Sequence, residues 1–152
     1  MRIVKHILPA FIFVLWGVLA LGPSVYADPS VDVHDLNLGL VGEDDFLAGH
    51  ILIPGLPVHW QSDVPWRLLV SSVDPDLGPS DDAAYVKPLD DFLWKLSEDE
   101  NWTPMSQYPE EVYWSTETGS GVIYVDVAVR LDWLSDAPGD YHADLIFTVE
   151  PL

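Results

Sequence analysis

Apolar and polar residues alternate strictly in two segments near the end of the chain, residues 121–133 and residues 139–151. A repeat of two is typical of a strand that buries one face and exposes the other. Pro138 and Gly139 favour a turn between the segments, so the pattern predicts two long strands joined as an antiparallel hairpin. The positions expected to face inward are Ile123, Val125, Val127, Val129, Leu131 and Trp133 in the first strand, and Tyr141, Ala143, Leu145, Phe147 and Val149 in the second.

Shorter strands are expected earlier in the chain. Residues 31–40 alternate as well, but the apolar positions change from odd to even near Asp35, which indicates a bulge of one extra residue. Residues 50–60 contain two apolar stretches divided by Pro54 and Gly55. Because this pair of residues favours a turn, the segment is expected to form two short strands.

Three further segments complete the pattern. Residues 65–73 predict a strand, and residues 110–116 predict another that ends at a glycine-containing turn. Residues 88–102 leave two readings open, one or two helical turns or a short strand, and no long segment has a helical repeat of 3.6. The positions expected to face inward in the first of these segments are Trp66, Leu68 and Val70.

The fold class predicted by this succession is all-β, an antiparallel β-sandwich. About seven or eight short strands separated by turns at intervals of about 8–12 residues are typical of sandwiches. Many of the 13 prolines fall at expected strand starts or edges, where the missing N–H breaks no ladder. Residues 28–152 are long enough for one domain with its own core.

The first 27 residues are expected to be a signal peptide. Arg2 and Lys5 give a positive start, residues 7–22 form an apolar run, and Val25 and Ala27 fit the small-residue cleavage pattern. The run is shorter than the roughly 20 residues of a spanning helix, although a retained anchor is the alternative. The chain has no cysteine, and export without disulfides favours a prokaryotic envelope. We therefore predict a secreted or extracytoplasmic protein with no membrane span after cleavage.

The charge of the chain excludes one class of partner. The formal net charge is −19, and all 25 acidic residues follow residue 27. A surface this negative repels nucleic acid phosphates and anionic lipids, so no nucleic acid partner is expected. Divalent cations, a basic partner or a saline medium are compatible with it. The bases that follow residue 27 are Arg67, Lys87, Lys95 and Arg130.

Two short stretches carry a family resemblance. Residues 138–151, with a Pro-Gly turn, Tyr141 and an alternating strand, resemble the closing strand of bacterial extracellular immunoglobulin-like domains. The resemblance implies an immunoglobulin-like sandwich in which the Tyr141 hydroxyl bonds back to the backbone, as in a tyrosine corner. The triplets at 66–68 and 94–96, both Trp-x-Leu, are similar to the paired motif of WxL cell-surface domains, which are secreted and wall-associated.

An acidic loop at residues 71–84 is the candidate metal site. Calcium takes six to eight oxygen ligands and tolerates irregular loops, so closely spaced aspartates with a glycine are compatible with it. The alternative is a solvated turn between two strands, in which Asp and Pro serve turn formation. Calcium is the one possible cofactor, and the candidate ligands are Asp74, Asp76, Asp81 and Asp82.

The tryptophans and histidines are further candidates for ligand or metal binding. Trp66 and Trp133 lie on apolar strand faces and are expected in the core, whereas Trp102 and Trp114 stand beside polar residues and prolines. Partly exposed indoles of this kind could stack on sugar rings, so Trp102 and Trp114 are the candidate ligand-binding residues. Trp60 is also expected to be partly exposed. The histidines of residues 28–152 are dispersed without zinc-ligand spacing, at His34, His50, His59 and His142.

These observations favour a protein that is not an enzyme. No nucleophile elbow, activated cysteine or phosphate loop is present, and the adjacent acids Asp44–Asp45 and Glu110–Glu111 would point apart on a strand. We predict a secreted, non-catalytic binding or structural protein of the prokaryotic envelope or of an extracellular assembly. Its partner would be a protein or a cell surface, reached by surface complementarity or by strand addition at a sheet edge. The alternatives are a carbohydrate-binding module and a small extracytoplasmic hydrolase.

Overall fold

The computed structural model describes residues 2–3, 30–32 and 41–152, which form eleven strands in three antiparallel or mixed sheets. The five-stranded sheet has the order β2-β3-β10-β7-β8, the four-stranded sheet β1-β11-β4-β9, and the small sheet β5-β6. The strands are β1 (Arg2–Ile3), β2 (Ser30–Asp32), β3 (His50–Ser62), β4 (Trp66–Ser72), β5 (Asp76–Pro79), β6 (Val86–Pro88), β7 (Phe92–Leu96), β8 (Thr103–Pro104), β9 (Glu110–Ser115), β10 (Gly119–Arg130) and β11 (Asp144–Pro151). The helices are α1 (Glu43–Ala48) and the single 3₁₀ turn η1 (Leu89–Asp91).

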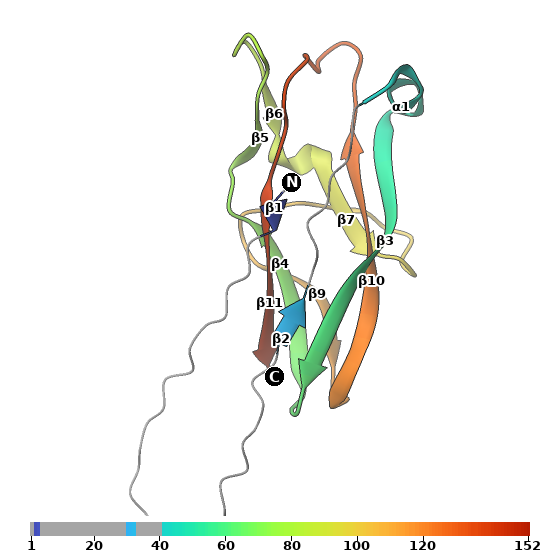
Figure 1. The fold of residues 1–152 in the computed structure, drawn as a ribbon, viewed down its shortest axis with the longest axis vertical. Coiled ribbons are helices and arrows are strands. Elements are labelled where there is room, and N and C mark those ends of the chain that lie inside the picture. Colours follow the sequence, from blue (N-terminus) through green and yellow to red (C-terminus); the bar gives the residue numbers. More distant parts are fainter. Residues whose placement is uncertain (1, 4–29, 33–40) are drawn as a thin grey trace, which may run out of the picture.

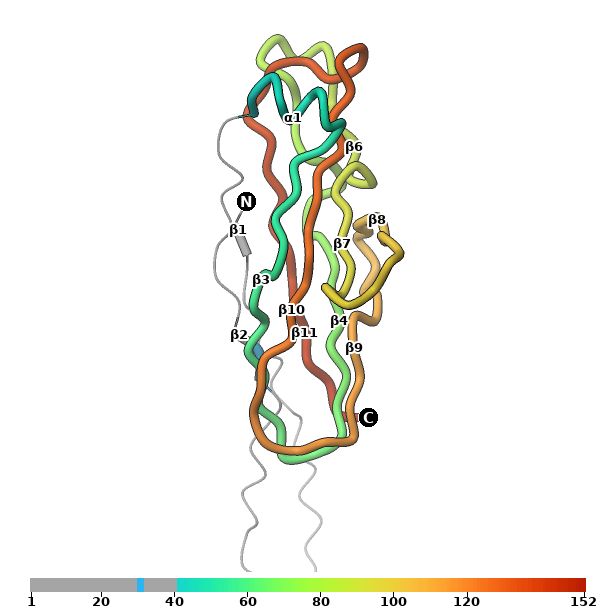
Figure 2. The backbone as a smooth tube through the Cα atoms, turned by 90° about the vertical axis from the view of Figure 1, so that its right-hand side faces the viewer, coloured from blue at the N-terminus to red at the C-terminus, as the bar shows by residue number. Residues whose placement is uncertain are grey.

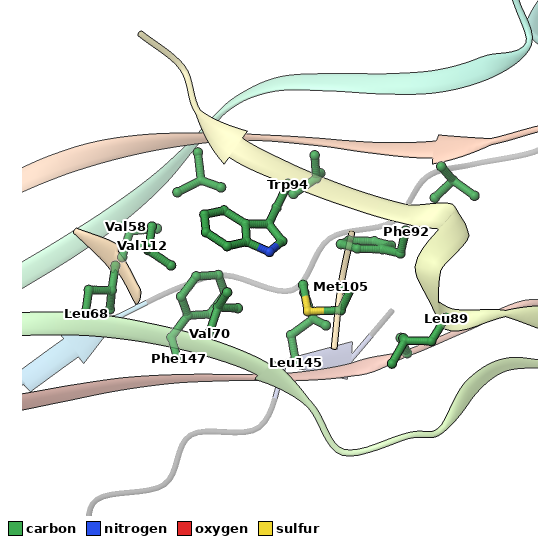
Figure 3. Packing of buried hydrophobic residues seen from close by; sticks show 14 of the residues in the cluster. Val58, Leu68, Val70, Leu89, Phe92, Trp94, Met105, Val112, Leu145 and Phe147 are labelled. Carbon is green, nitrogen blue, oxygen red and sulfur yellow. The ribbon is translucent and has the colours of Figure 1, made fainter. Parts of the chain in front are cut away.

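The two larger sheets pack face to face as a sandwich, which confirms the all-β fold class (Figure 1). One cluster of buried apolar side chains fills the space between them and draws on both sheets (Figure 3). The strand β4 contributes three of these side chains, since Trp66 and Leu68 are fully buried and Val70 is 2% exposed. The alternation in residues 65–73 and in residues 139–151 therefore predicted the inward faces correctly.

The strand β3 is one continuous strand, so the predicted division at Pro54 and Gly55 is wrong. Leu56 pairs with Val125 and Ile53 pairs with Val127, so the two residues between them face the single residue Asp126 of β10. Two residues against one define a β-bulge, and Gly55 takes the positive φ of 71° that such a bulge requires. The turn-forming pair thus bends a strand without ending it.

The strands β10 and β11 lie in different sheets and do not form the predicted hairpin. The strand β10 is the centre of the five-stranded sheet and pairs with β3 on one side and β7 on the other. Both of its edges are therefore occupied, and the chain after Arg130 crosses to the other sheet before β11 begins at Asp144 (Figure 1). We call residues 131–143 the crossover. Alternation identified both strands but could not identify their partners.

Trp133 is not a core residue, which corrects the expectation from its place in the alternating pattern. The strand β10 ends at Arg130, and Trp133 stands in the crossover with 57% of its surface exposed. Its indole stacks on Phe46 of α1, with ring centroids 4.5 Å apart. The helix α1 was not anticipated; it ends at Gly49, whose φ of 75° suits the left-handed cap of a helix.

Residues 88–102 contain both of the predicted alternatives, a helical turn and then a short strand. The turn η1 is followed directly by the strand β7, which pairs with β10. The bulge predicted near Asp35 and the predicted signal peptide, apart from Arg2 and Ile3, lie outside the described residues. Within the part of the chain that the structure describes, no helix is long and apolar enough to cross a membrane.

Candidate functional site

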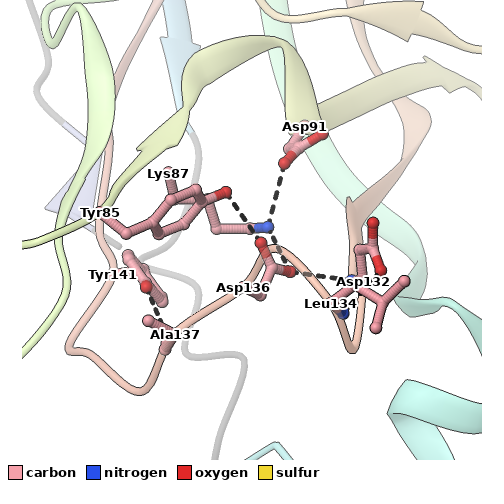
Figure 4. A network of polar contacts seen from close by, with 8 residues as sticks. All are labelled: Tyr85, Lys87, Asp91, Asp132, Leu134, Asp136, Ala137 and Tyr141. Carbon is pink, nitrogen blue, oxygen red and sulfur yellow. Dashed lines mark hydrogen bonds and ion pairs between the residues drawn. The ribbon is translucent and has the colours of Figure 1, made fainter.

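One end of the sandwich holds a cluster of ionised and hydroxyl side chains around Lys87. The turn of the β5–β6 hairpin, α1 and the crossover gather at this end (Figure 2). Lys87, in β6, is 1% exposed and donates to Asp136 at 2.7 Å and to Asp91 at 3.0 Å. The Asp136 side chain is 4% exposed, and its other oxygen accepts a hydrogen bond from the Tyr85 hydroxyl at 2.9 Å. The cluster therefore consists of a buried pair, Lys87 and Asp136, and a second acid, Asp91, whose side chain keeps 23% of its surface exposed (Figure 4).

The crossover is folded tightly enough to present Asp136 to this cluster. The Asp132 N–H donates to the Asp136 carboxylate at 3.0 Å, and the Asp136 N–H donates to the Asp132 carbonyl at 2.9 Å. The Tyr141 hydroxyl donates to the Ala137 carbonyl four residues upstream, at 2.5 Å. This is the backbone contact that the resemblance to a tyrosine corner implied.

The electrostatics of the cluster follow from burial and hydrogen bonding. Burial alone would raise the pKa of Asp136, but hydrogen bonds from Lys87, the Asp132 N–H and Tyr85 outweigh it and hold the pKa below the ordinary 3.8. Burial raises the pKa of Tyr85, and the hydrogen bond to Asp136 raises it further. The pKa of Tyr141 is raised by burial and then by the charge of Asp136.

The acidic loop does not gather its aspartates around a common point. Asp74 accepts a hydrogen bond from the Asp144 N–H at 2.7 Å, and Asp76 accepts one from the Gly78 N–H at 3.0 Å. Asp82 accepts from the Ser80 hydroxyl and the Ala84 N–H, and these hydrogen bonds lower its pKa. The Asp81 N–H donates to the crossover at Pro138.

These hydrogen bonds fit the turn interpretation of residues 71–84. The segment contains β5 and the start of a turn that leads into β6. In the described residues no three His, Asp or Glu side chains stand close enough together to hold a metal ion. Calcium binding by Asp74, Asp76, Asp81 and Asp82 stays a prediction.

The two candidate ligand-binding tryptophans lie in different surroundings. Trp114 is in β9 and is 58% exposed. Trp102 is half-buried in the loop between β7 and β8, and the Lys95 ammonium lies 5.4 Å from its ring centroid. The ring contacts found among the described residues do not include one between these two indoles. A shared platform for a sugar ring stays a prediction.

The remaining predicted groups are dispersed. His50, His59 and His142 are exposed, and His34 lies outside the described residues. Asp44 and Asp45 are in the first turn of α1, where a carboxylate is favoured by the helix dipole, and the Gly42 N–H donates to Asp45 at 2.8 Å. Glu110 and Glu111 follow each other on β9, where neighbouring side chains point to opposite faces.

Asp126 fixes the bulge of β3 through a second, smaller network. It accepts hydrogen bonds from the Gly55 N–H at 2.8 Å and from the Ser97 hydroxyl at 2.5 Å, and its ion pair with Lys95 measures 3.2 Å. Burial raises its pKa, but these hydrogen bonds outweigh burial, so the pKa of Asp126 lies below its ordinary value of 3.8. The folded state therefore favours the ionised form of Asp126.

We expect Asp126→Asn to reduce both stability and its dependence on acid. Because the folded-state pKa is depressed, the contribution of Asp126 is complete above the ordinary 3.8 and is lost as the pH falls through the folded-state value. Replacement should cost about 1–2 kcal/mol at neutral pH, since charge-assisted hydrogen bonds are lost. Urea unfolding between about pH 6 and pH 2 measures both effects. Glu111→Gln, at an exposed position of β9, is the control; an equal effect there would contradict the role of Asp126.

The outer edge of the four-stranded sheet is the candidate assembly surface. The strand β11 pairs with β4 along its whole length, from Leu145 opposite Ser72 to Pro151 opposite Trp66. On its other side, the partner in the described part of the chain is β1, a parallel pairing that reaches Asp144 and Leu145. Beyond residue 145 no described strand pairs with β11 on this side.

The direction of the β11 backbone groups follows from two hydrogen bonds. The Asp144 carbonyl accepts from Val73 at 2.8 Å, and the Leu152 N–H donates to Pro65 at 2.9 Å, so the even-numbered residues face β4. In an antiparallel pair, successive residues point their backbone groups to opposite sides. The N–H groups of Phe147 and Val149 therefore face the outer edge. Sequence alternation could identify β11 but carried no signal for which strand would be an edge.

Comparisons with known proteins bear on the fold. No family model matches the sequence, and the search of curated proteins finds no matching sequence. Among solved structures, the chain is similar to a chain of a chaperone-usher pilus, in a structure described as revealing the molecular basis of rod uncoiling. The TM-score is 0.52 and the identity 12%, over 95% of this chain and 99% of that one. A similarity at this identity shows the fold alone, a β-sandwich. The finer resemblances, to immunoglobulin-like and WxL domains, stay predictions.

Proposed function

We propose that this protein is a non-catalytic structural component of an extracellular or envelope assembly, and that it joins a neighbouring subunit by strand addition at β11. The observation that carries the proposal is the outer edge of β11, where the N–H groups of Phe147 and Val149 face away from β4. An extended segment that pairs there would continue the sheet, and its alternate side chains would meet the partly buried rim of the core.

The partial cover of this edge supports the same proposal. Arg2 and Ile3, which pair with the start of β11, belong to the predicted signal peptide. Cleavage after Ala27 would remove them and leave the backbone of β11 available along its length. Sheet edges of this kind attract further strands unless they are protected. The similarity of fold to a pilus subunit agrees with an assembly role.

Amide hydrogen exchange tests whether the edge is open and then filled. In the exported monomer obtained from the full-length gene, the Phe147 and Val149 amides should exchange at least about 100-fold faster than those of Ile146 and Thr148. In assemblies recovered from the cell surface, all four should be protected. Equal protection of the odd and even positions in the monomer would contradict an open edge.

Two substitutions at one position separate strand addition from core packing. Val149→Pro removes an N–H of the outer edge, whereas Val149→Ala truncates the same side chain and keeps that N–H. We expect the proline variant to remain monomeric on native gels of envelope material while the alanine variant still assembles. Assembly of both variants, with both folded by circular dichroism, would overturn strand addition at β11.

A further inference from the structure

We propose that Lys87 and Asp136 condense to form an intramolecular amide bond, with Asp91 as the proton carrier and Tyr85 as the hydrogen-bond donor that stabilises the intermediate. The starting point is that one of the four bases after residue 27 is removed from water almost completely. The side chains of Lys87 and Asp136 are 1% and 4% exposed, and the Lys87 nitrogen and the nearer Asp136 oxygen are 2.7 Å apart. This inference is independent of strand addition at β11.

Stability alone is a weak reason for such a pair. The desolvation of two ions offsets much or all of their attraction, so an apolar pair of similar volume often stabilises a protein as well. The pair at Arg67 and Glu150 lies across two strands and keeps both side chains more than 40% exposed. The chain thus contains an ordinary exposed ion pair, and the Lys87 cluster differs from it in burial and in its additional partners.

The geometry places the amine next to the carbon that it would attack. The carboxyl carbon of Asp136 is one bond from the oxygen that Lys87 contacts, so the nitrogen lies within about 4 Å of it, near the 3–3.5 Å of a near-attack arrangement. The side chains of Lys87, Asp91 and Asp136 come from β6, η1 and the crossover and point toward one another (Figure 4). Because the Lys87 nitrogen and the Asp136 oxygen are in direct contact, the proton that the ammonium must lose has an acceptor 2.7 Å away.

The atoms balance in three steps. The ammonium of Lys87 gives one proton to the contacting oxygen of Asp136, which leaves a neutral amine and a carboxylic acid. The amine then forms an N–C bond, and the other oxygen of Asp136, which accepts a hydrogen bond from Tyr85 at 2.9 Å, carries the negative charge. Asp91, 3.0 Å from the nitrogen, takes a proton from it and returns that proton to the departing hydroxyl. The C–O bond breaks, water leaves and an amide remains, with no change of oxidation state.

The product would join two residues that are 49 positions apart in the sequence. Lys87 belongs to the β5–β6 hairpin, and Asp136 belongs to the crossover between the two large sheets. A covalent link there would hold the end of the sandwich closed and restrict the unfolded chain, as a disulfide does. The chain has no cysteine with which to form a disulfide.

Intact mass spectrometry of the denatured, exported protein tests the proposal. The expected mass is that of the processed sequence less one water molecule, and fragmentation should yield a branched peptide that joins Lys87 to Asp136. A cyclic imide at another aspartate would also lose water, but hydroxylamine opens the imide and leaves the amide intact. A mass equal to that of the full processed sequence, or a water loss located elsewhere, would overturn the proposal.

Three variants assign the roles of the groups. Lys87→Arg removes the nucleophile and should restore the full mass. Asp91→Asn keeps a side chain of the same shape beside Lys87 but cannot carry the proton, so most of the protein should remain unlinked in samples taken soon after export. Glu111→Gln is the matched control, an exposed acid on β9, and should show complete linkage. Complete linkage of Asp91→Asn would remove Asp91 from the mechanism, and linkage in Lys87→Arg would overturn the assignment to Lys87.

Discussion

Replacement of Trp66 with alanine is expected to lower the free energy of unfolding by about 3–5 kcal/mol. Trp66 has no exposed surface, and its indole N–H donates to the Glu117 carbonyl at 3.2 Å. Its ring contacts Trp60 and Tyr113, with centroids 4.6 Å and 5.7 Å away. Truncation would leave a cavity between the sheets and a carbonyl without its donor. Urea unfolding followed by circular dichroism measures the loss.

Trp114→Ala is the matched control for this prediction. It removes the same side chain from the neighbouring strand β9, where Trp114 pairs with Arg67 and is 58% exposed. A surface substitution of this kind usually changes stability by no more than about 0.5 kcal/mol. A loss from Trp66→Ala that is no larger than the loss from Trp114→Ala would contradict the placement of Trp66 in the core.

The second large effect is expected at the opposite end of the sandwich. Relative to the protein in which Lys87 and Asp136 are an unlinked ion pair, Lys87→Met should lower the free energy of unfolding by about 3–5 kcal/mol, because Asp136 would remain buried without its cation. The double variant Lys87→Met/Asp136→Leu should recover part of this loss, since it removes the remaining buried carboxylate. Denaturant unfolding of the two variants at the same pH provides the comparison.

Two results would contradict this prediction. A loss below about 1 kcal/mol for Lys87→Met would show that the cluster tolerates an unpaired Asp136. A double variant less stable than the single one would show that the hydrogen bonds to Asp136 from Tyr85 and the Asp132 N–H contribute more than the burial of its charge costs.

The strands could be predicted from the sequence because a strand that buries one face has apolar residues at every second position. The inward positions of β4 and β11 were predictable for this reason, and Leu68 and Leu145 are fully buried as expected. The same repeat wrongly predicted that Trp133 is buried, because the alternation in the sequence continues beyond Arg130, where β10 ends. The bulge at Pro54 and Gly55 was predicted as a turn, because the same residue types favour both structures.

The Lys87 cluster could not be found from the sequence. Lys87 lies between a valine and a proline, and Asp136 lies in an acidic, turn-rich segment, so neither stands in a recognisable motif. The one available signal was the scarcity of bases after residue 27, which makes each of them a candidate for a specific contact. Lys87 and Asp136 are 49 positions apart in the sequence, and only the packing of the β5–β6 hairpin against the crossover brings them together.

The sequence by itself therefore determined the all-β fold class and the inward faces of the main strands. It also determined the negative surface, since these properties follow from local alternation and from composition. The tertiary structure decided which strands became neighbours, where β11 became an edge and which acid met Lys87. Strand pairing depends on contacts between distant residues: β10 pairs with β3 and β7 on its two sides, so β11 does not pair with β10 and instead pairs with β4 in the other sheet.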